Sequence, residues 1–149
     1  MIALLQRVSA AHVSVDKKIV GRIEKGLLAL VGIEKGDTEQ QTQRLLERIL
    51  GYRVFGDKSD KMNLSITDIK GGLLLVPQFT LAADTQKGMR PSFAPAAAPA
   101  MSEALFNALV AEAHKKHSHV ATGQFGANMQ VSLTNDGPVT FWLRVTPKR

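Results

Sequence analysis

The chain has 149 residues, of which 44% are hydrophobic and 21% charged, with a formal net charge of +6, a balance that excludes a disordered polypeptide and favours one domain with a sizeable core. It contains no cysteine, which excludes disulfides, thiolate catalysis and cysteine-based zinc sites. No apolar run approaches the ~20 residues of a membrane span, and the first residues do not resemble a signal peptide, so we expect a cytoplasmic protein with no membrane partner.

Seven stretches have the alternation or the continuous apolar character of β-strands. Residues 26–33 and 73–76 are almost wholly apolar, which is typical of strands that are covered on both faces. In chain order, the predicted strands are residues 2–15, 19–23, 26–33, 52–55, 73–76, 129–133 and 139–145.

Two segments have the helical spacing of apolar residues. In the first, Asp37 can cap the opening turn, Gln40 follows three residues later as in a capping box, and Gly51 can end the helix. The second covers residues 99–119. Strands outnumber helices, so we predict an α/β fold: a single mixed domain, residues 1–149, with two barrel-like β-sheet layers and the two helices packed on one side.

Polar residues at the end of one predicted strand lead into a long connection over residues 82–98, and connections of this length without a period are usually functional or mobile. Gln78 and Thr80 lie where active groups are often placed. The alternative is that Thr80 is an ordinary strand residue and Gln78 faces solvent. Within the connection, Lys87 and Arg90 can meet phosphate or can be ordinary surface charges.

A Gly137-Pro138 pair lies between the last two predicted strands. Proline has no N–H for a ladder and glycine has no Cβ, so the pair forms a bare and stiff piece of main chain. The residues alone favour a hairpin turn, because Asn-Asp-Gly-Pro at 135–138 is ordinary turn chemistry.

Three histidines lie close together near the end of the second predicted helix, at His114, His117 and His119. No acidic ligand lies between them as in a His-Glu-x-x-His zinc site. We interpret them as residues that cap a helix C-terminus, and we expect no metal and no cofactor. The sequence has no Gly-x-Ser-x-Gly elbow, phosphate loop or dinucleotide fingerprint.

Two motifs together resemble the signature motifs of the D-aminoacyl-tRNA deacylases: Gln-Phe-Thr-Leu at residues 78–81 and Asn-Asp-Gly-Pro-Val-Thr at residues 135–140. The resemblance covers nearly the whole chain and includes Leu-Leu-Gln-Arg-Val-Ser-Ala-Ala at 4–11 and Lys-Gly-x-Arg-Pro-Ser-Phe at 87–93. One departure is Pro77, where the family usually has serine, so position 77 offers neither a hydroxyl nor a backbone N–H.

The resemblance implies a homodimeric enzyme that hydrolyses the ester of D-aminoacyl-tRNA, with tRNA and not DNA as its nucleic-acid partner. It implies that Gly137 and Pro138, joined by a cis peptide, reach into the pocket of the other subunit and that Arg7 holds them in place. Rigid carbonyl groups of this pair would reject L-amino acids and would admit glycine.

The catalytic residues implied are Gln78, Phe79 and Thr80. We expect main-chain N–H groups near Phe79 and Thr80 to stabilise the oxyanion, and Gln78 to orient the acyl end. Either Thr80 or the 2′-hydroxyl of the RNA activates water, and a threonine without a neighbouring base is a poor nucleophile.

Two other functions remain open from the residues. An excess of 19 Lys and Arg over 13 Asp and Glu is compatible with a non-catalytic tRNA-binding module. The histidines near the C-terminus are compatible with a zinc hydrolase, although neighbouring lysines disfavour a dication.

Overall fold

The computed structural model describes residues 1–148. Its strands are β1 (Ile2–Val15), β2 (Lys18–Ile23), β3 (Gly26–Gly32), β4 (Phe55–Gly56), β5 (Met62–Leu64), β6 (Gly72–Pro77), β7 (Val120–Thr122) and β8 (Gln130–Arg144). Its helices are α1 (Glu39–Gly51), α2 (Ile66–Ile69), the 3₁₀ helix η1 (Phe79–Ala82) and α3 (Pro99–Lys116). Over this range, none of the helices has the length and apolar composition needed to cross a bilayer.

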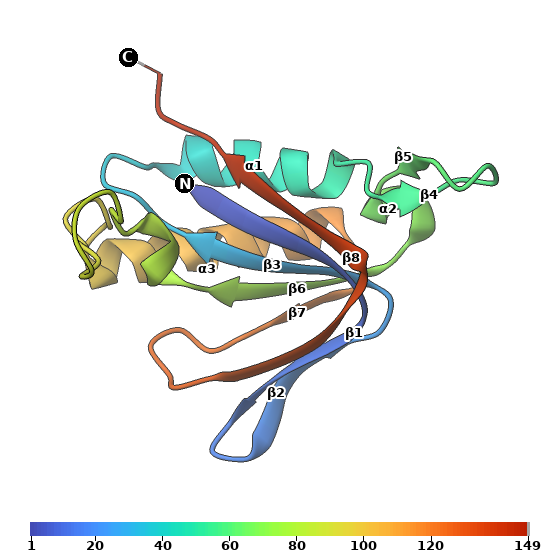
Figure 1. Cartoon of the computed structure of the whole chain (residues 1–149), viewed down its shortest axis with the longest axis horizontal. Helices are drawn as coiled ribbons and strands as arrows, with labels where there is room; N and C mark the ends of the chain where they lie inside the picture. The colour runs from blue at the N-terminus through green and yellow to red at the C-terminus, as the bar shows by residue number, and fades with distance from the viewer. Residues whose placement is uncertain (149) are drawn as a thin grey trace.

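A long first strand organises the main sheet. β1 pairs antiparallel with β2, β3 and β8, and the sheet continues from β3 through the parallel strands β6 and β7. The two ends of the sheet approach each other closely, because a Cβ at Gly21 on β2 would overlap the carbonyl oxygen of Thr122 on β7. The sheet is therefore a nearly closed barrel (Figure 1), and β4 and β5 form a small second sheet.

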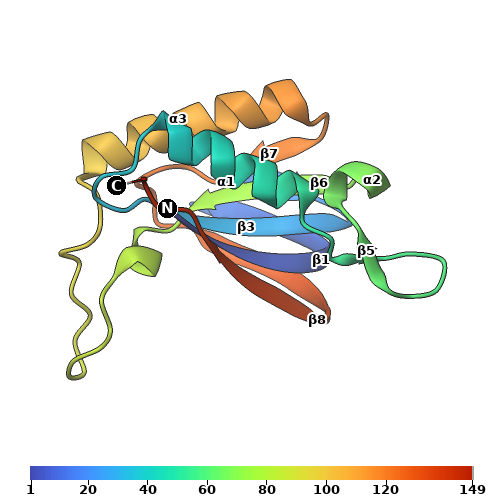
Figure 2. The same ribbon diagram turned by 90° about the horizontal axis from the view of Figure 1, so that it is seen from above.

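The two long helices, α1 and α3, lie side by side over one face of the main sheet (Figure 2). Their apolar faces and the facing side chains of β3 and β6 form the larger core. The prediction of an α/β fold with two helices packed on one side of barrel-like sheet layers is confirmed. The buried side chains of this core include Leu27, Leu45, Leu46, Ile49, Leu73 and Leu109.

A second core fills the inside of the barrel. Leu28 of β3 and Leu74 and Val76 of β6 point into it, whereas their neighbours Leu27 and Leu73 point toward the helices. Side chains alternate between the two faces of a strand, so β3 and β6 are buried on both. This confirms the interpretation of the two almost wholly apolar stretches.

The start of α1 differs from the prediction. Thr38, and not Asp37, is the N-cap, and its capping-box partner is Gln41, whose Oε1 accepts the Thr38 N–H at 2.8 Å. Asp37 is buried, and its carboxylate accepts hydrogen bonds from the Glu34 N–H at 2.8 Å and the Met1 α-ammonium at 3.0 Å. Because the buried Asp37 carboxylate already binds a cationic partner, it does not cap the helix, and the next residue, Thr38, is the N-cap. The helix ends at Gly51, as predicted.

Short elements account for the other differences. The second predicted helix ends at Lys116, before the predicted end at residue 119, and β7, which was not predicted, begins at Val120. Helix α2 was not predicted, because a single turn is too short to show a period; Ser65 caps it, and Lys70 ends it with φ 55°. The stretch predicted as a strand over 52–55 contributes only its last residue, in β4.

The prediction of two final strands separated by a turn is wrong. β8 runs along β1 with two irregularities in the register. The larger lies between the pairs Gln6–Thr140 and Val8–Asn135, and the smaller between Val8–Asn135 and Ala10–Thr134. Residues 136–139 therefore stand opposite Arg7 alone, as a large bulge. Local turn chemistry is present, but the strand is held on both sides of it by long-range pairing with β1.

Candidate active site

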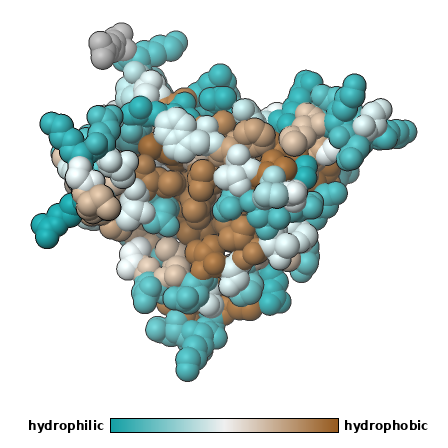
Figure 3. All heavy atoms as spheres, viewed as in Figure 1, coloured by the Kyte–Doolittle hydropathy of each residue, from teal (hydrophilic) through white to brown (hydrophobic). Residues whose placement is uncertain are grey.

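A pocket of about 700 Å³ opens beside the end of β6. Figure 3 shows apolar side chains gathered in a hollow in the middle of one face, between the ribbons of β6 and β8 in Figure 1, with hydrophilic residues around it. The walls come from four segments: β6 with η1, the connection to α3, the start of α3, and the connection from β7 into β8. The lining residues are Val76 to Phe79, Phe93, Ala96 to Pro99, Ser102, Phe125 to Ala127, Met129 and Val131.

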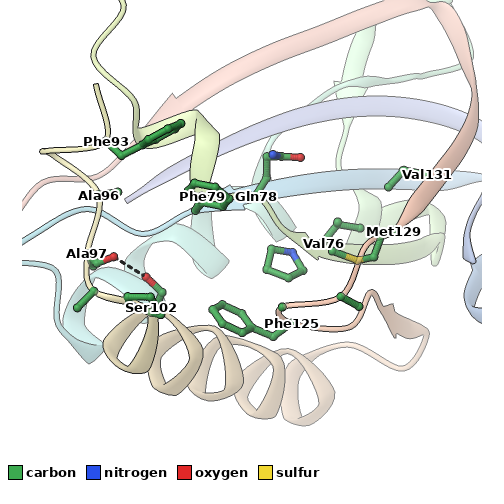
Figure 4. A pocket seen from close by; sticks show the side chains of 15 residues that line it. Val76, Gln78, Phe79, Phe93, Ala96, Ala97, Ser102, Phe125, Met129 and Val131 are labelled. Carbon is green, nitrogen blue, oxygen red and sulfur yellow. Dashed lines mark hydrogen bonds between the residues drawn. The ribbon is translucent and has the colours of Figure 1, made fainter. Parts of the chain in front are cut away.

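Aromatic side chains shape the pocket (Figure 4). The rings of Phe79 and Phe93 pack with centroids 5.1 Å apart and planes tilted by 51°. Phe125 and Ser102 lie across from Phe79, and the Ser102 hydroxyl donates to the carbonyl oxygen of Ala97 at 3.3 Å. A largely apolar cavity with few polar groups at fixed places is typical of a small-ligand site.

The motif at residues 78–81 lies where β6 ends. The Gln78 N–H donates to the carbonyl oxygen of Val31 at 2.8 Å, which extends the ladder by one residue, and the chain then turns into η1. The Gln78 Nε2 donates to the Thr80 hydroxyl. Gln78 and Phe79 line the pocket, whereas Thr80 is exposed beside it. The alternative of Thr80 as a strand residue is wrong, because it lies in a 3₁₀ helix.

The main-chain N–H groups of Phe79 and Thr80, at the start of η1, are candidates for binding an anion. Leu81 and Ala83 donate to the carbonyl oxygens of Gln78 and Thr80, each at 3.2 Å. The N–H groups of Phe79 and Thr80 precede these bonds, and within residues 1–148 they make no main-chain hydrogen bond. Phe79 lines the pocket next to Gln78, and Thr80 follows it just outside the lining.

The second motif forms the bulge of β8. The Gly137–Pro138 peptide is cis, both residues are exposed, and neither lines the pocket of its own chain. Asn135 spans the bulge: its Oδ1 accepts the Val139 N–H at 2.9 Å, and its Nδ2 donates to the Thr140 hydroxyl at 2.8 Å. The bare main chain of the pair is thus presented to the outside from a braced strand.

Arg7 braces the same bulge from β1. Its Nε donates to the carbonyl oxygen of Asp136 at 3.0 Å, and its Nη1 donates to that of Val54 at 2.8 Å. Its Nη2 would lie 3.1 Å from a Cβ placed on Gly137, which has φ +135°. The structure therefore brings Arg7 against the motif, and a side chain at position 137 would meet it.

His117 has a structural role. Its N–H donates to the carbonyl oxygen of Ala113 at 2.9 Å at the C-cap of α3, and its buried ring nitrogen lies 2.6 Å from the carbonyl oxygen of Gly71. The interpretation of a helix-capping histidine is confirmed for this residue. Within the described part of the chain, no group of three or more His, Cys, Asp and Glu side chains is arranged to hold a metal.

Phe93, Ser102 and Phe125 were not singled out by the sequence as site residues. Phe93 was noted only as part of the 87–93 motif, and Phe125 lies between the second predicted helix and the strand predicted at 129–133. Ser102, a polar residue that shares a helix face with Leu105 and Leu109, was the available signal for the pocket wall.

Known proteins share this arrangement of elements. The family described as D-Tyr-tRNA(Tyr) deacylase matches residues 4–144. A protein from Thioalkalivibrio sulfidiphilus named D-aminoacyl-tRNA deacylase is 66% identical over 149 residues, which covers 100% of each chain. One from a Janthinobacterium species with the same name is 61% identical over 147 residues, which covers 99% of each.

Two solved structures superpose well. One, titled "c-Myc DNA Unwinding Element Binding Protein", has a TM-score of 0.94 and 35% identity, covering 99% of this chain and 100% of the other. The second is described as a probable eukaryotic D-amino acid tRNA deacylase, with a TM-score of 0.80 and 17% identity over 95% and 97% of the two chains. The latter supports the fold alone.

The barrel, the one-sided helices and the pocket at the end of β6 define a small mixed α/β protein with a cavity for a small ligand. The chain belongs to the D-aminoacyl-tRNA deacylase family, because the family match covers residues 4–144, which is most of its length. The resemblance that the two motifs indicated is confirmed, and so is the expectation of an enzyme.

Proposed function

We propose that the chain hydrolyses the ester between a D-amino acid and the 3′-terminal ribose of tRNA. The observation that carries this proposal is the pocket of about 700 Å³ that begins at Gln78 and Phe79, in a chain whose relatives are named D-aminoacyl-tRNA deacylase. Its apolar walls suit an aminoacyl or nucleoside group. The polar groups at its η1 end suit the ester.

In the reaction, water attacks the ester carbonyl carbon, whose oxygen becomes an oxyanion. The C–O bond to the ribose then breaks, the ribose oxygen takes a proton, and the products are the free D-amino acid and tRNA. The N–H groups of Phe79 and Thr80 are the donors that stabilise the oxyanion, because they are free of main-chain acceptors within residues 1–148. Gln78 orients the acyl end beside them.

Thr80 holds Gln78 and does not attack the ester. Its hydroxyl accepts from the Gln78 amide, which is a donor and cannot serve as a base. Within the described residues, no carboxylate or imidazole is hydrogen-bonded to this hydroxyl, so nothing activates it as a nucleophile. The vicinal 2′-hydroxyl of the substrate ribose therefore activates the water.

Selection between D- and L-amino acids is made by main chain from a second subunit. Gly137 and Pro138 are exposed and do not line the pocket of their own chain, so in a homodimer they are available to the pocket of the partner. A D- and an L-residue differ by exchange of Cβ and Hα. Carbonyl groups fixed against the Cα admit one hand only, whatever the side chain is, and they also admit glycine.

The contacts around the bulge support this role. Arg7 and Asn135 hold the main chain on both sides of Gly137 through hydrogen bonds of 3.0 Å to Asp136 and 2.9 Å from Val139. A Cβ on Gly137 would lie 2.7 Å from the Val139 side chain. A filter of this kind needs a rigid and bare backbone, and both properties are present.

The natural setting of this reaction is the cytoplasm, with tRNA and not DNA as partner. One structural neighbour carries a title that refers to binding of a DNA element, so the test includes DNA. The protein is incubated with D- and L-aminoacyl-tRNA, with and without chelator and competing duplex DNA. Release of only the D-amino acid in every condition is expected.

Each rival has its own outcome in that assay. Salt-sensitive tRNA binding without release of any amino acid would replace the proposal by a non-catalytic tRNA-binding module. Loss of activity in chelator would favour a zinc hydrolase. Release that is abolished by duplex DNA would contradict the choice of nucleic-acid partner.

A further inference from the structure

A closed loop projects beside the pocket, between η1 and α3. Asp84 and Ser92 exchange two main-chain hydrogen bonds, of 2.8 and 2.9 Å, and the Asp84 carboxylate accepts the Gln86 N–H at 3.0 Å. Gly88 turns the tip with φ +67°. Figure 2 shows this connection extending away from the sheet. The loop, residues 84–92, therefore has a defined shape although it is exposed.

The loop is joined to the pocket by an aromatic contact. Phe93 directly follows Ser92, lines the pocket, and packs on Phe79 at 5.1 Å between ring centroids. Four residues further on, the Ala97 N–H donates to the carbonyl oxygen of Ile33 at 3.1 Å. The base of the loop is thus fixed on the pocket wall, and its tip lies outside the mouth.

The tip of the loop carries positive charge without a partner. Lys87 and Arg90 are exposed, and among the ion pairs of residues 1–148 neither side chain takes part. The acid nearest in sequence, Asp84, is engaged with the loop main chain. Met89 between them is 102% exposed and offers an apolar contact for a base.

We propose that Lys87 and Arg90 bind phosphates of the single-stranded 3′ end of tRNA while its terminal ester lies in the pocket. This inference rests on the proposed function, since it needs an RNA ester in the pocket. Arg90 is three residues from Phe93, at most about 10 Å of extended chain. The phosphate that links the terminal nucleotide to the rest of tRNA lies one nucleotide from the ester. When the ester lies in the pocket, this phosphate is therefore within reach of the loop.

A double variant, Lys87→Gln with Arg90→Gln, tests the assignment with two esters. D-aminoacyl-tRNA has the phosphates, whereas D-aminoacyl-adenosine has the same ester without them. We expect kcat/KM for the tRNA ester to fall roughly tenfold at low salt, and the log–log dependence on salt to become shallower by about 0.7 for each lost phosphate contact. Hydrolysis of D-aminoacyl-adenosine is expected to stay unchanged.

The matched control is Lys17→Gln with Lys18→Gln, at the turn from β1 and the first residue of β2. It removes the same charge at a place that contributes no pocket-lining residue. It is expected to leave both esters and the salt dependence unchanged. An equal loss in this control would show that net charge, and not the loop, attracts tRNA, and would overturn the proposal.

Other outcomes also overturn it. Unchanged kinetics and salt dependence in the loop variant would contradict the phosphate contact. An equal loss with D-aminoacyl-adenosine would mean that the loop shapes the pocket. A change of mass in light scattering would mean that the loop contacts a second copy of the chain.

Affinity for uncharged tRNA separates the two proposals. A weaker affinity in the loop variant supports the loop contact even if no ester is cleaved. An unchanged affinity contradicts the loop contact even if D-aminoacyl-tRNA is cleaved normally.

Discussion

Arg7 on the first strand donates a hydrogen bond of 3.0 Å to the carbonyl oxygen of Asp136, the residue before Gly137. The same guanidinium donates at 2.8 Å to Val54, which lies between α1 and β4. Arg7, which is 129 residues before Asp136 in sequence, therefore ties the bulge of β8 to the segment between α1 and β4. This bracing keeps the exposed Gly137–Pro138 main chain in one position.

We predict that Arg7→Lys weakens discrimination between D- and L-aminoacyl-tRNA. A lysine ammonium lacks the planar fork that reaches two carbonyl oxygens, and charged hydrogen bonds are worth about 1.5–3 kcal/mol each. The ratio of kcat/KM for the D-ester to that for the L-ester is expected to fall by about tenfold or more. An unchanged ratio in a folded variant would mean that Arg7 does not position the motif.

Gly137→Ala is expected to abolish most D-ester hydrolysis. The new Cβ would lie 2.7 Å from the Val139 side chain and 3.1 Å from Arg7, at a φ of +135° that other residues rarely adopt. Steady-state kinetics on D-aminoacyl-tRNA should show a loss of at least about 100-fold. Gly51→Ala is the control, because nothing lies within 4 Å of its added Cβ, and it should keep full activity. Normal cleavage by Gly137→Ala would remove the bulge from the mechanism.

Thr80→Ala should reduce turnover by less than about tenfold, because the hydroxyl only accepts a hydrogen bond from Gln78. In contrast, a D-aminoacyl-tRNA that ends in 2′-deoxyadenosine should be cleaved extremely slowly. Single-turnover rates on the two substrates measure both effects. Thr80 would instead be the nucleophile if the Thr80→Ala enzyme were nearly inactive and the unaltered enzyme cleaved the 2′-deoxy substrate at a normal rate.

Acid stability should depend on Glu34. Burial alone would raise the pKa of this carboxyl, but hydrogen bonds from Arg144 at 2.8 Å and the Met1 α-ammonium at 2.8 Å, with their charges, hold the pKa below its ordinary value. The unfolded chain then binds the proton more readily than the folded one, so this stabilisation is complete above the unfolded pKa and is lost as pH falls through the folded pKa. Thermal melts of Glu34→Gln across the acid range should show a smaller decline of Tm than the wild type. A decline as steep as in the wild type would assign the acid sensitivity to other groups.

Periodicity was sufficient for the two long helices and for most of the main sheet, but it did not predict the short strand β7. The continuous apolar stretches of β3 and β6 predicted burial on both faces, and the helical spacing of apolar residues predicted α1 and α3. It was not sufficient at the chain segments that build the site. The bulge of β8 depends on its pairing with β1, where one residue, Arg7, faces residues 136–139, and no local pattern reports a pairing so distant in sequence.

The pocket wall shows the same limit. Phe93, Ser102 and Phe125 come from three segments and meet only in the folded chain. Apolar and small residues of this kind are common in any core, so their types did not mark a site. The motif at residues 78–81 was found because it and the motif at 135–140 together resemble those of the deacylase family. Its turn into η1 was not visible in the sequence.

A mixing experiment tests the cross-subunit site most directly. One variant, Gly137→Ala, loses the selecting main chain; the other, Ala127→Trp, fills the pocket, which Ala127 lines. Each alone is expected to be inactive on D-aminoacyl-tRNA. Unfolding and refolding an equal mixture should restore about one quarter of wild-type activity, because half of the dimers are mixed and each has one intact site. Mixed dimers that are detected by mass but remain inactive would contradict a site shared between subunits.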